Sequence, residues 1–193
     1  MVLFASLSII TNYHLPLSGA LCVSRVLMQL ELLSKDHLDK LLAFELENRS
    51  WFDSLIEPRG NDFYSPQGVG RHIEAELNKV NSGTAFCGLL IKNNEIVARA
   101  NLRDISTNKA FVGYRVSKRF LSQGYASFCL ASLIDIAKSK FCLQSLEAKV
   151  LENNPASKHV LLKQGFESIG NVPNFIILNN KQLDCTKFRL KYA

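Results

Sequence analysis

An apolar segment that runs into a basic, glycine-containing turn constrains this chain more than any other feature. Residues 110–116 are apolar enough for a buried strand, and residues 119–124 turn directly into a long apolar helix. Backbone N–H groups at a helix start lack acceptors, and the helix dipole favours negative charge there. Gly124 lets a ligand approach the backbone closely, and Lys118 and Arg119 add positive charge beside it. We therefore expect this unit to bind a phosphate-bearing ligand.

The hydrophobic pattern of the whole chain predicts a single α+β domain. Strands are expected where apolar residues alternate or run together, and helices where they recur every three to four residues. In chain order the predicted elements are strand 28–33, helix 34–48, helix 66–81, strands 84–92, 95–105 and 110–116, helix 124–140, strand 145–151, helix 155–164, and C-terminal strands starting at 166, 175 and 185. Short turns join the three central strands, so we expect an antiparallel meander.

Composition narrows the class of protein. A hydrophobic fraction of 47% and a charged fraction of 21% are typical of a globular domain, and the net charge of +6 only weakly favours anionic partners. Without a Lys/Arg run, zinc spacing or an aromatic-interleaved basic stripe, we expect no direct binding of nucleic acid and no metal site. The five cysteines are odd in number and lack C-x-x-C spacing. This pattern predicts free, mostly buried thiols in a reducing, cytoplasmic compartment.

The first 24 residues contain no Lys, Arg, Asp or Glu. A signal peptide would need an early positive charge, and a membrane helix would need about 20 mainly apolar residues, whereas Pro16 and several polar residues interrupt this stretch. Because Met28 directly precedes the first patterned strand, we expect residues 1–27 to be an extension outside the fold and residues 28–193 to form the domain. A signal or anchor is the alternative, since residues 18–20 are compatible with a cleavage site.

From residue 28 to about residue 192, the order of elements and motifs resembles the GNAT acetyltransferase superfamily. The family's acetyl-CoA loop has Arg or Gln, two residues, Gly, one residue, then Gly or Ala. Residues 119–124 read R-F-L-S-Q-G, so Ser122 stands where the first glycine would be. N-P-A-S at 154–157 and G-F at 165–166 resemble the second cofactor segment. Within the superfamily, these motifs, the Asn48-Arg49 pair and residues 174–184 resemble the enzymes that acetylate N-terminal amines of ribosomal proteins.

The resemblance implies a single mixed, mostly antiparallel central sheet with helices on both faces. It also implies direct transfer of an acetyl group from acetyl-CoA to a primary amine, with no acyl-enzyme, no metal and no membrane. The acceptor is expected to be the N-terminal amine of a protein, in particular a ribosomal one. The alternatives are a small-molecule amine (a polyamine, an antibiotic or an amino acid) or a non-catalytic CoA-binding module. The oligomeric state, a homodimer included, stays open.

The same resemblance implies where the cofactor binds, in a splay between strands 110–116 and 145–151. The residues expected there lie at the end of the first strand, in the turn, and at the start of helix 155–164. They are Tyr114, Arg115 and Val116 for the pantetheine arm and carbonyl, Arg119, Ser122, Gln123, Gly124, Tyr125 and Ala126 for the pyrophosphate, and Asn154, with Ser157 beside it, for the amide chain.

The general acid has two interpretations. Many relatives carry a tyrosine four residues before the final glycine, but this chain has Leu161 there. Ser157, one turn earlier on the same helix, resembles the serine of the ribosomal-protein enzymes and is the candidate acid. Alternatively, it only satisfies backbone N–H groups at the helix start.

The general base also has two interpretations. Glu147, on the strand that flanks the expected cleft, is the candidate base and could act through water. The alternative is a solvated or salt-bridged strand carboxylate, with Glu45, Glu47 and Arg49 shaping the acceptor entrance instead.

Overall fold

The computed structural model describes residues 28–192, so the predicted extension at residues 1–27 lies outside the described part. A seven-stranded sheet in the order β1-β2-β3-β4-β5-β7-β6 forms the centre of the fold. Its strands are β1 Leu30–Leu32, β2 Phe86–Lys92, β3 Glu95–Arg103, β4 Lys109–Val116, β5 Ser145–Leu151, β6 Glu167–Leu178 and β7 Lys181–Lys191. Only the β4–β5 pair is parallel.

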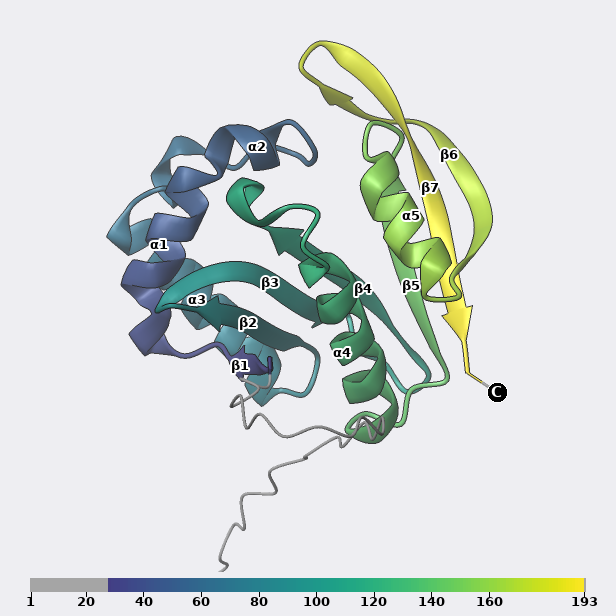
Figure 1. The fold of residues 1–193 in the computed structure, drawn as a ribbon, viewed down its shortest axis with the longest axis horizontal. Helices are drawn as coiled ribbons and strands as arrows, with labels where there is room; N and C mark the ends of the chain where they lie inside the picture. Colours follow the sequence, from purple (N-terminus) through teal and green to yellow (C-terminus); the bar gives the residue numbers. More distant parts are fainter. Residues whose placement is uncertain (1–27, 193) are drawn as a thin grey trace, which may run out of the picture.

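Helices cover both faces of this sheet (Figure 1). They are α1 Leu38–Glu47, α2 Arg49–Asp53, α3 Pro66–Asn81, α4 Tyr125–Ser139 and α5 Pro155–Lys163, with short 3-10 turns η1 Lys35–His37, η2 Asn61–Phe63 and η3 Lys118–Phe120. The predicted mixed, mostly antiparallel sheet with helices on both faces is confirmed. Within residues 28–192, no helix is both long enough and apolar enough to cross a membrane.

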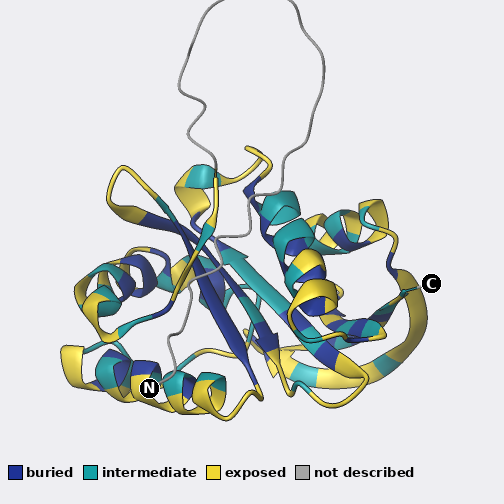
Figure 2. Ribbon diagram, turned by 90° about the horizontal axis from the view of Figure 1, so that it is seen from below, coloured by how far each residue is buried: buried dark blue, intermediate teal, exposed yellow. Residues whose placement is uncertain are grey.

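Two apolar cores lie on opposite faces of the sheet. On one face, α4 buries Leu130, Leu133 and Ala137 against β3, β4 and β5. On the other face, α1 and α3 bury residues such as Leu41 and Ile73 against β2 and β3. Figure 2 shows the resulting buried central strands between two partly exposed helical layers. Because the central strands are covered on both sides, most residues of β2 and β3 are buried, Arg99 included.

The β4–β5 contact is short, and this feature creates the site. The two parallel strands pair only from Lys109–Ser145 to Phe111–Glu147, although β4 continues to Val116 and β5 to Leu151. Beyond these pairs the strands diverge, so the backbone of β4 has no strand partner on that side. An unpaired strand edge offers N–H and C=O groups to a ligand.

Three predicted segments differ from the observed ones. The strand predicted at 28–33 is shorter, Leu30–Leu32, and the segment 49–64, predicted as irregular, contains the short helix α2. The C-terminal strands are longer than predicted and form a hairpin of β6 and β7. Pro173, which cannot donate to the sheet, and Asn174, with a φ of 54°, coincide with a break in the β6 register. The break hides the continuity of the strand from a pattern search.

The start of α3 packs so closely against η2 that no side chain fits at Gly68. A Cβ atom there would lie 2.0 Å from the backbone oxygen of Asp62 and 2.7 Å from that of Phe63. The Ser65 hydroxyl caps the helix by accepting a hydrogen bond from the Gly68 N–H, at 3.0 Å. Gly70 in the same helix has a different environment, since its Cβ would meet only Leu38 Cδ1 at 3.5 Å. The two glycines form a matched pair for a test of this packing.

We expect Gly68→Ala to lower the free energy of unfolding by about 1–3 kcal/mol, because the new methyl group forces α3 away from η2. Gly70→Ala should leave the free energy unchanged or raise it by up to ~1 kcal/mol, since alanine favours the helix and meets only ordinary contacts. Urea unfolding of both variants measures the difference. Equal stability of the two variants would contradict the described packing.

Candidate active site

Two pockets, each of about 440 Å³, meet where β4 and β5 diverge. One opens toward the start of α4 and is lined by Phe120, Ser122, Gly124 and further residues of that turn; we name it the α4 pocket. The other lies toward α3 and is lined by Arg59, Arg99, Arg103, Arg115, Lys149 and neighbouring residues; we name it the arginine pocket. Tyr114, Arg115, Asn154 and Ser157 line both pockets. The two pockets therefore adjoin at these residues, and we refer to the two together as the passage.

The turn before α4 has the backbone that an anion site requires. Gly124 is the N-cap of α4 with a φ of 82°, and Ser122 also has a left-handed backbone, with a φ of 59°. The first N–H groups of α4 have no acceptor within the helix and lie at the positive end of its dipole. Ser122 adopts the conformation that glycine reaches without strain, at a cost of about 1–2 kcal/mol. The turn therefore keeps a left-handed backbone at residue 122, although serine replaces the first glycine of the family motif.

Most of the residues predicted for the cofactor line the α4 pocket. They are Tyr114, Arg115, Val116, Ser122, Gly124, Tyr125, Ala126, Asn154 and Ser157. Arg119 and Gln123 do not line it. The Arg119 guanidinium forms ion pairs with Glu47 at 3.0 Å and Glu95 at 2.9 Å. These two carboxylates of the protein itself compensate its charge at the surface. Gln123 donates a long, 3.5 Å hydrogen bond to the Arg119 backbone oxygen.

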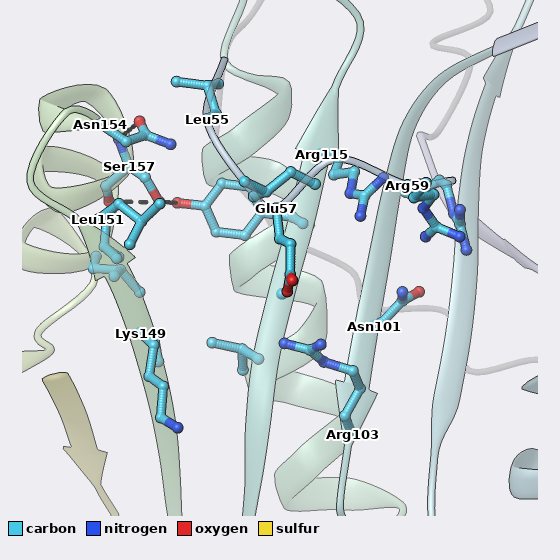
Figure 3. Close-up of a pocket in the computed structure, with 18 of the residues that line it drawn as sticks. Leu55, Glu57, Arg59, Asn101, Arg103, Arg115, Lys149, Leu151, Asn154 and Ser157 are labelled. Atoms are coloured by element: carbon cyan, nitrogen blue, oxygen red, sulfur yellow. Dashed lines mark hydrogen bonds between the residues drawn. The ribbon is translucent and has the colours of Figure 1, made fainter. Parts of the chain in front are cut away.

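A pair of hydroxyl groups, those of Tyr114 and Ser157, stands where the linings of the two pockets overlap. Figure 3 labels Ser157 and its neighbour Asn154. The Tyr114 hydroxyl lies 3.0 Å from Ser157 Oγ, and the Asn154 side chain accepts a hydrogen bond from the Ser157 N–H at 3.0 Å. Burial raises the pKa of the Tyr114 phenol, which the Ser157 hydrogen bond partly offsets, so the phenol is protonated at neutral pH. Asn154, not Ser157, therefore caps α5. Leu161 is 1% exposed and offers no hydroxyl.

The floor of the arginine pocket contains a buried carboxylate held by two guanidinium groups. Glu45 of α1 has no exposed surface and accepts hydrogen bonds from Arg99 Nη1 and, at 3.2 Å, from Arg115 Nη1. Burial alone would raise the pKa of Glu45, but the charges of the two arginines hold it below its usual value. Burial also lowers the pKa of Arg115 to about 10, so both groups are charged at neutral pH. Glu45 is thus a fixed structural anion.

His72 of α3 completes this floor as a neutral side chain. Its Nε2 lies 3.0 Å from Arg99 Nη2, and because a guanidinium can only donate, Nε2 must accept. Burial, together with the charges of Arg99 and Arg59, lowers the pKa of His72 to about 4. The imidazole therefore carries no charge at pH 7.

The arginine pocket is the part of the site that the sequence patterns did not reveal. Besides Arg99 and Arg115, its cations are Arg59, Arg103 and Lys149, and its two carboxylates are Glu57 and Glu76. One signal was present: Arg99, Asn101 and Arg103 alternate along β3, and alternate residues of a strand share a face. Nothing in the sequence indicates that Glu57 and Arg59, from the loop before η2, lie opposite that face.

The structure does not bring Glu147 to this passage. Its carboxylate accepts hydrogen bonds from Arg189 at 2.8 Å and from Lys109 at 3.5 Å, in a separate surface depression. Burial would raise the pKa of Glu147, but these two cations lower it. The predicted base is therefore an ion-paired strand carboxylate. Glu47 is also ion-paired on the surface, and Arg49 hydrogen-bonds Asn61 at 2.5 Å.

Cys87 and Cys129, two buried cysteines on opposite faces of the sheet, are poor nucleophiles. Cys87, Cys129, Cys142 and Cys185 are all free thiols. Burial raises the pKa of Cys87 and of Cys129 to about 12, and a hydrogen bond to Glu76 adds to the effect at Cys87. A thiol attacks as its thiolate, so neither Cys87 nor Cys129 is activated. Residues 28–192 also contain no group of three His, Cys, Asp or Glu side chains placed to hold a metal ion.

Comparison with known proteins identifies the family. The acetyltransferase (GNAT) domain family model matches residues 28–167. A probable N-acetyltransferase of Bacillus subtilis (strain 168) is 25% identical over 134 residues, which are 67% of this chain and 74% of the relative. The chain belongs to the GNAT acetyltransferase family and is an acyltransferase.

Solved structures with the same fold act on different acceptors. The ribosomal-protein-S5-alanine acetyltransferase of Vibrio fischeri superposes with a TM-score of 0.80 at 18% identity, covering 85% of this chain and 92% of that one. A ribosomal L7/L12 α-N-protein acetyltransferase in complex with coenzyme A gives 0.79 at 20% identity, covering 86% and 94%. A spermidine N-acetyltransferase of Vibrio cholerae, in complex with CoA and spermine, gives 0.71 at 16% identity, covering 85% and 95%.

The depressed pKa of His72 predicts how stability depends on pH. The unfolded chain protonates His72 near pH 6.5, whereas the folded protein does so only near pH 4. Between these values the unfolded state binds more protons, so the free energy of unfolding must fall as the pH falls. We expect a loss of about 1–2 kcal/mol between pH 7 and pH 5 from this group.

His72→Gln should remove this part of the pH dependence, because glutamine can still accept from Arg99 but does not titrate. Chemical unfolding of both proteins at pH 7, 6 and 5 measures it. Parallel pH profiles for the wild type and the variant would contradict the assignment of a neutral, buried imidazole.

Proposed function

We propose that this protein transfers the acetyl group of acetyl-CoA directly to a primary amine. The observation that carries the proposal is the single passage through the splay of β4 and β5. It joins an anion-binding helix start to a polar pocket, with two hydroxyl groups at the junction. A cofactor entering from one side and an amine entering from the other would meet there. Such alignment can supply roughly 7–11 kcal/mol of the barrier.

On the cofactor side, the pyrophosphate fits the N–H groups of residues 122–126 and the pantetheine arm fits the unpaired edge of β4. Neutral side chains such as Phe120 and Tyr125 line most of the α4 pocket and suit the pantetheine chain. The thioester would then lie beside Tyr114 and Ser157. A thiol of pKa about 8.5 leaves readily, so a hydrogen bond from this hydroxyl pair is sufficient help for the departing thiolate.

On the acceptor side, the amine must lose a proton before it attacks, and Glu57 is our candidate proton acceptor. Of the two carboxylates that line the arginine pocket, Glu76 is bound by Lys79 at 2.8 Å and by the Cys87 thiol at 3.2 Å. Within residues 28–192, Glu57 has no ion-pair partner. Its exposed side chain points into the pocket (Figure 3), where a bridging water would reach both it and the amine.

The acceptor that the sequence motifs favour is the N-terminal amine of a protein, with ribosomal proteins as the first candidates. N-P-A-S at residues 154–157 lies at the junction of the pockets, which supports its use in this type of transfer. The second candidate is a small-molecule amine. The many charged side chains of the arginine pocket favour it, since they offer specific contacts to a compact polar acceptor.

Binding of acetyl-CoA tests the proposed function first. A ligand present at 100 times its Kd stabilises the native state by about 2.7 kcal/mol, which a thermal shift assay detects. Ser127→Glu should abolish the shift, because Ser127 lines the α4 pocket in the first turn of α4 and a carboxylate there repels the pyrophosphate. Glutamate is favourable at a helix start, so the fold should tolerate it, and Ser127→Gln controls for size. No shift for the wild type would refute cofactor binding.

Replacement of Glu57 tests the acceptor side. We expect Glu57→Gln to lower kcat/KM for amine acetylation by about 10²-fold at pH 7, as loss of a proton acceptor commonly does. The loss should shrink near pH 9, where an N-terminal amine of pKa about 8 is already neutral. Thiol release measured from pH 6.5 to 9.5 gives the profile. Glu147→Gln is the matched control and should retain full activity, and an equal loss in both variants would contradict the role of Glu57.

A further inference from the structure

We propose that the amine acceptor also carries an anionic group, a carboxylate or a phosphate, and that Arg59, Arg103 and Lys149 bind it. This inference rests on the proposed function, because it assigns the arginine pocket to the acceptor. It narrows the acceptor to molecules that present a positive amine and a negative group within one pocket of about 440 Å³.

The first observation is an excess of positive charge that the protein itself does not neutralise. Arg99 and Arg115 are paired with Glu45 beneath the pocket. In the described part of the chain, by contrast, Arg59, Arg103 and Lys149 form no ion pair with any carboxylate. These three cations are therefore available to a ligand.

The second observation is the position of these cations around the cavity. Arg103 and Lys149 extend from β3 and β5, the two strands on either side of β4, and Arg59 comes from the loop before η2 (Figure 3). The Arg59 guanidinium stacks on the Phe63 ring, 3.9 Å from its centroid, which fixes one face and leaves its N–H donors free. Burial lowers the pKa of Arg59, and the charge of Glu45 opposes this effect. Guanidinium groups held in this way suit the planar oxygens of carboxylates and phosphates.

The third observation is an unsatisfied polar group on the same wall. Asn101 is among the residues that line the arginine pocket, and its buried Oδ1 atom has no hydrogen-bond partner among residues 28–192. Buried polar atoms are normally paired, and an exception at a pocket wall indicates a place for a polar ligand atom. Its neighbours Arg99 and His72 already pair with each other. Because an amide oxygen only accepts hydrogen bonds, Asn101 can pair with an N–H or O–H group of the acceptor molecule, and not with its anion.

Glu57 adds a negative charge to a pocket that the three cations make positive. Its carboxylate points into the cavity that the three cations surround (Figure 3), so one pocket offers a site for an ammonium and a site for an anion. A zwitterionic acceptor satisfies both sites. A polyamine would satisfy only Glu57 and would place its further positive charges against Arg59, Arg103 and Lys149, and like charges brought together disfavour binding.

The required anion has two sources with the same chemistry. It can be an acidic side chain close to the N-terminus of a peptide, or the carboxylate or phosphate of a small amine. The test therefore uses matched acceptors of both kinds. The peptides are Ser-Glu-Glu-Ala, Ser-Gln-Gln-Ala and Ser-Lys-Lys-Ala, all amidated at the C-terminus. The small amines are glutamate, phosphoethanolamine, ethanolamine and spermidine.

Thiol release with the full-length protein and saturating acetyl-CoA measures kcat/KM for each acceptor. We expect the anionic member of at least one series to exceed its neutral counterpart by about tenfold, which corresponds to ~1.4 kcal/mol, and the cationic member to be poorest. Arg103→Gln combined with Lys149→Gln should remove this preference, mainly by raising KM for the anionic acceptor. Lys181→Gln combined with Lys187→Gln, at two exposed positions on β7, controls for the change in net charge. The series that responds identifies the source of the anion.

Equal use of anionic and neutral acceptors, a preference for cationic ones, or a preference that survives the Arg103 and Lys149 substitutions would overturn the inference. Failure of the proposed function gives a different result, namely no acetylation of any acceptor although acetyl-CoA binds. In that event, calorimetric binding of Ser-Glu-Glu-Ala and of phosphoethanolamine to the CoA complex decides. Binding that the double substitution weakens about tenfold supports the anion site, and unaffected or absent binding refutes it.

Discussion

The buried contact of Glu45 with Arg99 and Arg115 is the interaction on which the rest of the site depends. It joins α1 to the two central strands β3 and β4 and fixes both guanidinium groups at the floor of the arginine pocket. A buried ion pair adds little net stability, because both charges must leave water. Here the contact orients the two guanidinium groups. Removal of Glu45, or of both arginines, would leave an uncompensated charge in the core. One turn later, Asn48 accepts a hydrogen bond from the Lys118 N–H at 2.8 Å and so anchors the loop before α4.

The divergence of β4 and β5 turns this framework into a passage. The strands pair over three residue pairs and then separate, which leaves the β4 edge free and opens a pocket on each side. The pockets differ in chemistry because alternate residues of β4 face opposite sides of the sheet. Tyr114 packs toward α4 and meets Ser157, whereas Arg115 faces Glu45. One strand therefore contributes side chains to both pockets.

Much of the fold, and the grouping of most predicted cofactor residues around one pocket, could be predicted from the sequence. Helix α3 has the predicted bounds, Pro66–Asn81, because Ser65, Pro66 and the apolar spacing are all local signals. The cofactor loop was predictable for the same reason, since strand, turn and helix follow one another in the chain. Glu147 shows where this reasoning fails. It lies opposite Arg189 in the β5–β7 pairing, and that register depends on a strand about forty residues away, which no local pattern encodes.

The arginine pocket was missed because long-range packing assembles it. Arg103 and Lys149 come from strands on either side of β4, and Glu57 and Arg59 come from a loop without a regular pattern. Each of these side chains alone is an ordinary surface charge. Only the sheet order brings them around one cavity, and only the pairing of Glu45 with Arg99 and Arg115 distinguishes structural arginines from free ones.

The central claim is that acetyl-CoA and the acceptor occupy opposite halves of one passage. A crystal structure of the protein with bound acetyl-CoA tests it most directly. The account predicts the pyrophosphate within hydrogen-bond distance of the N–H groups of residues 122–126 and the thioester sulfur beside Tyr114 and Ser157, with no part of the cofactor among Arg59, Arg103 and Lys149. A pyrophosphate bound by those three cations would contradict it, since the arginine pocket would then be the cofactor site.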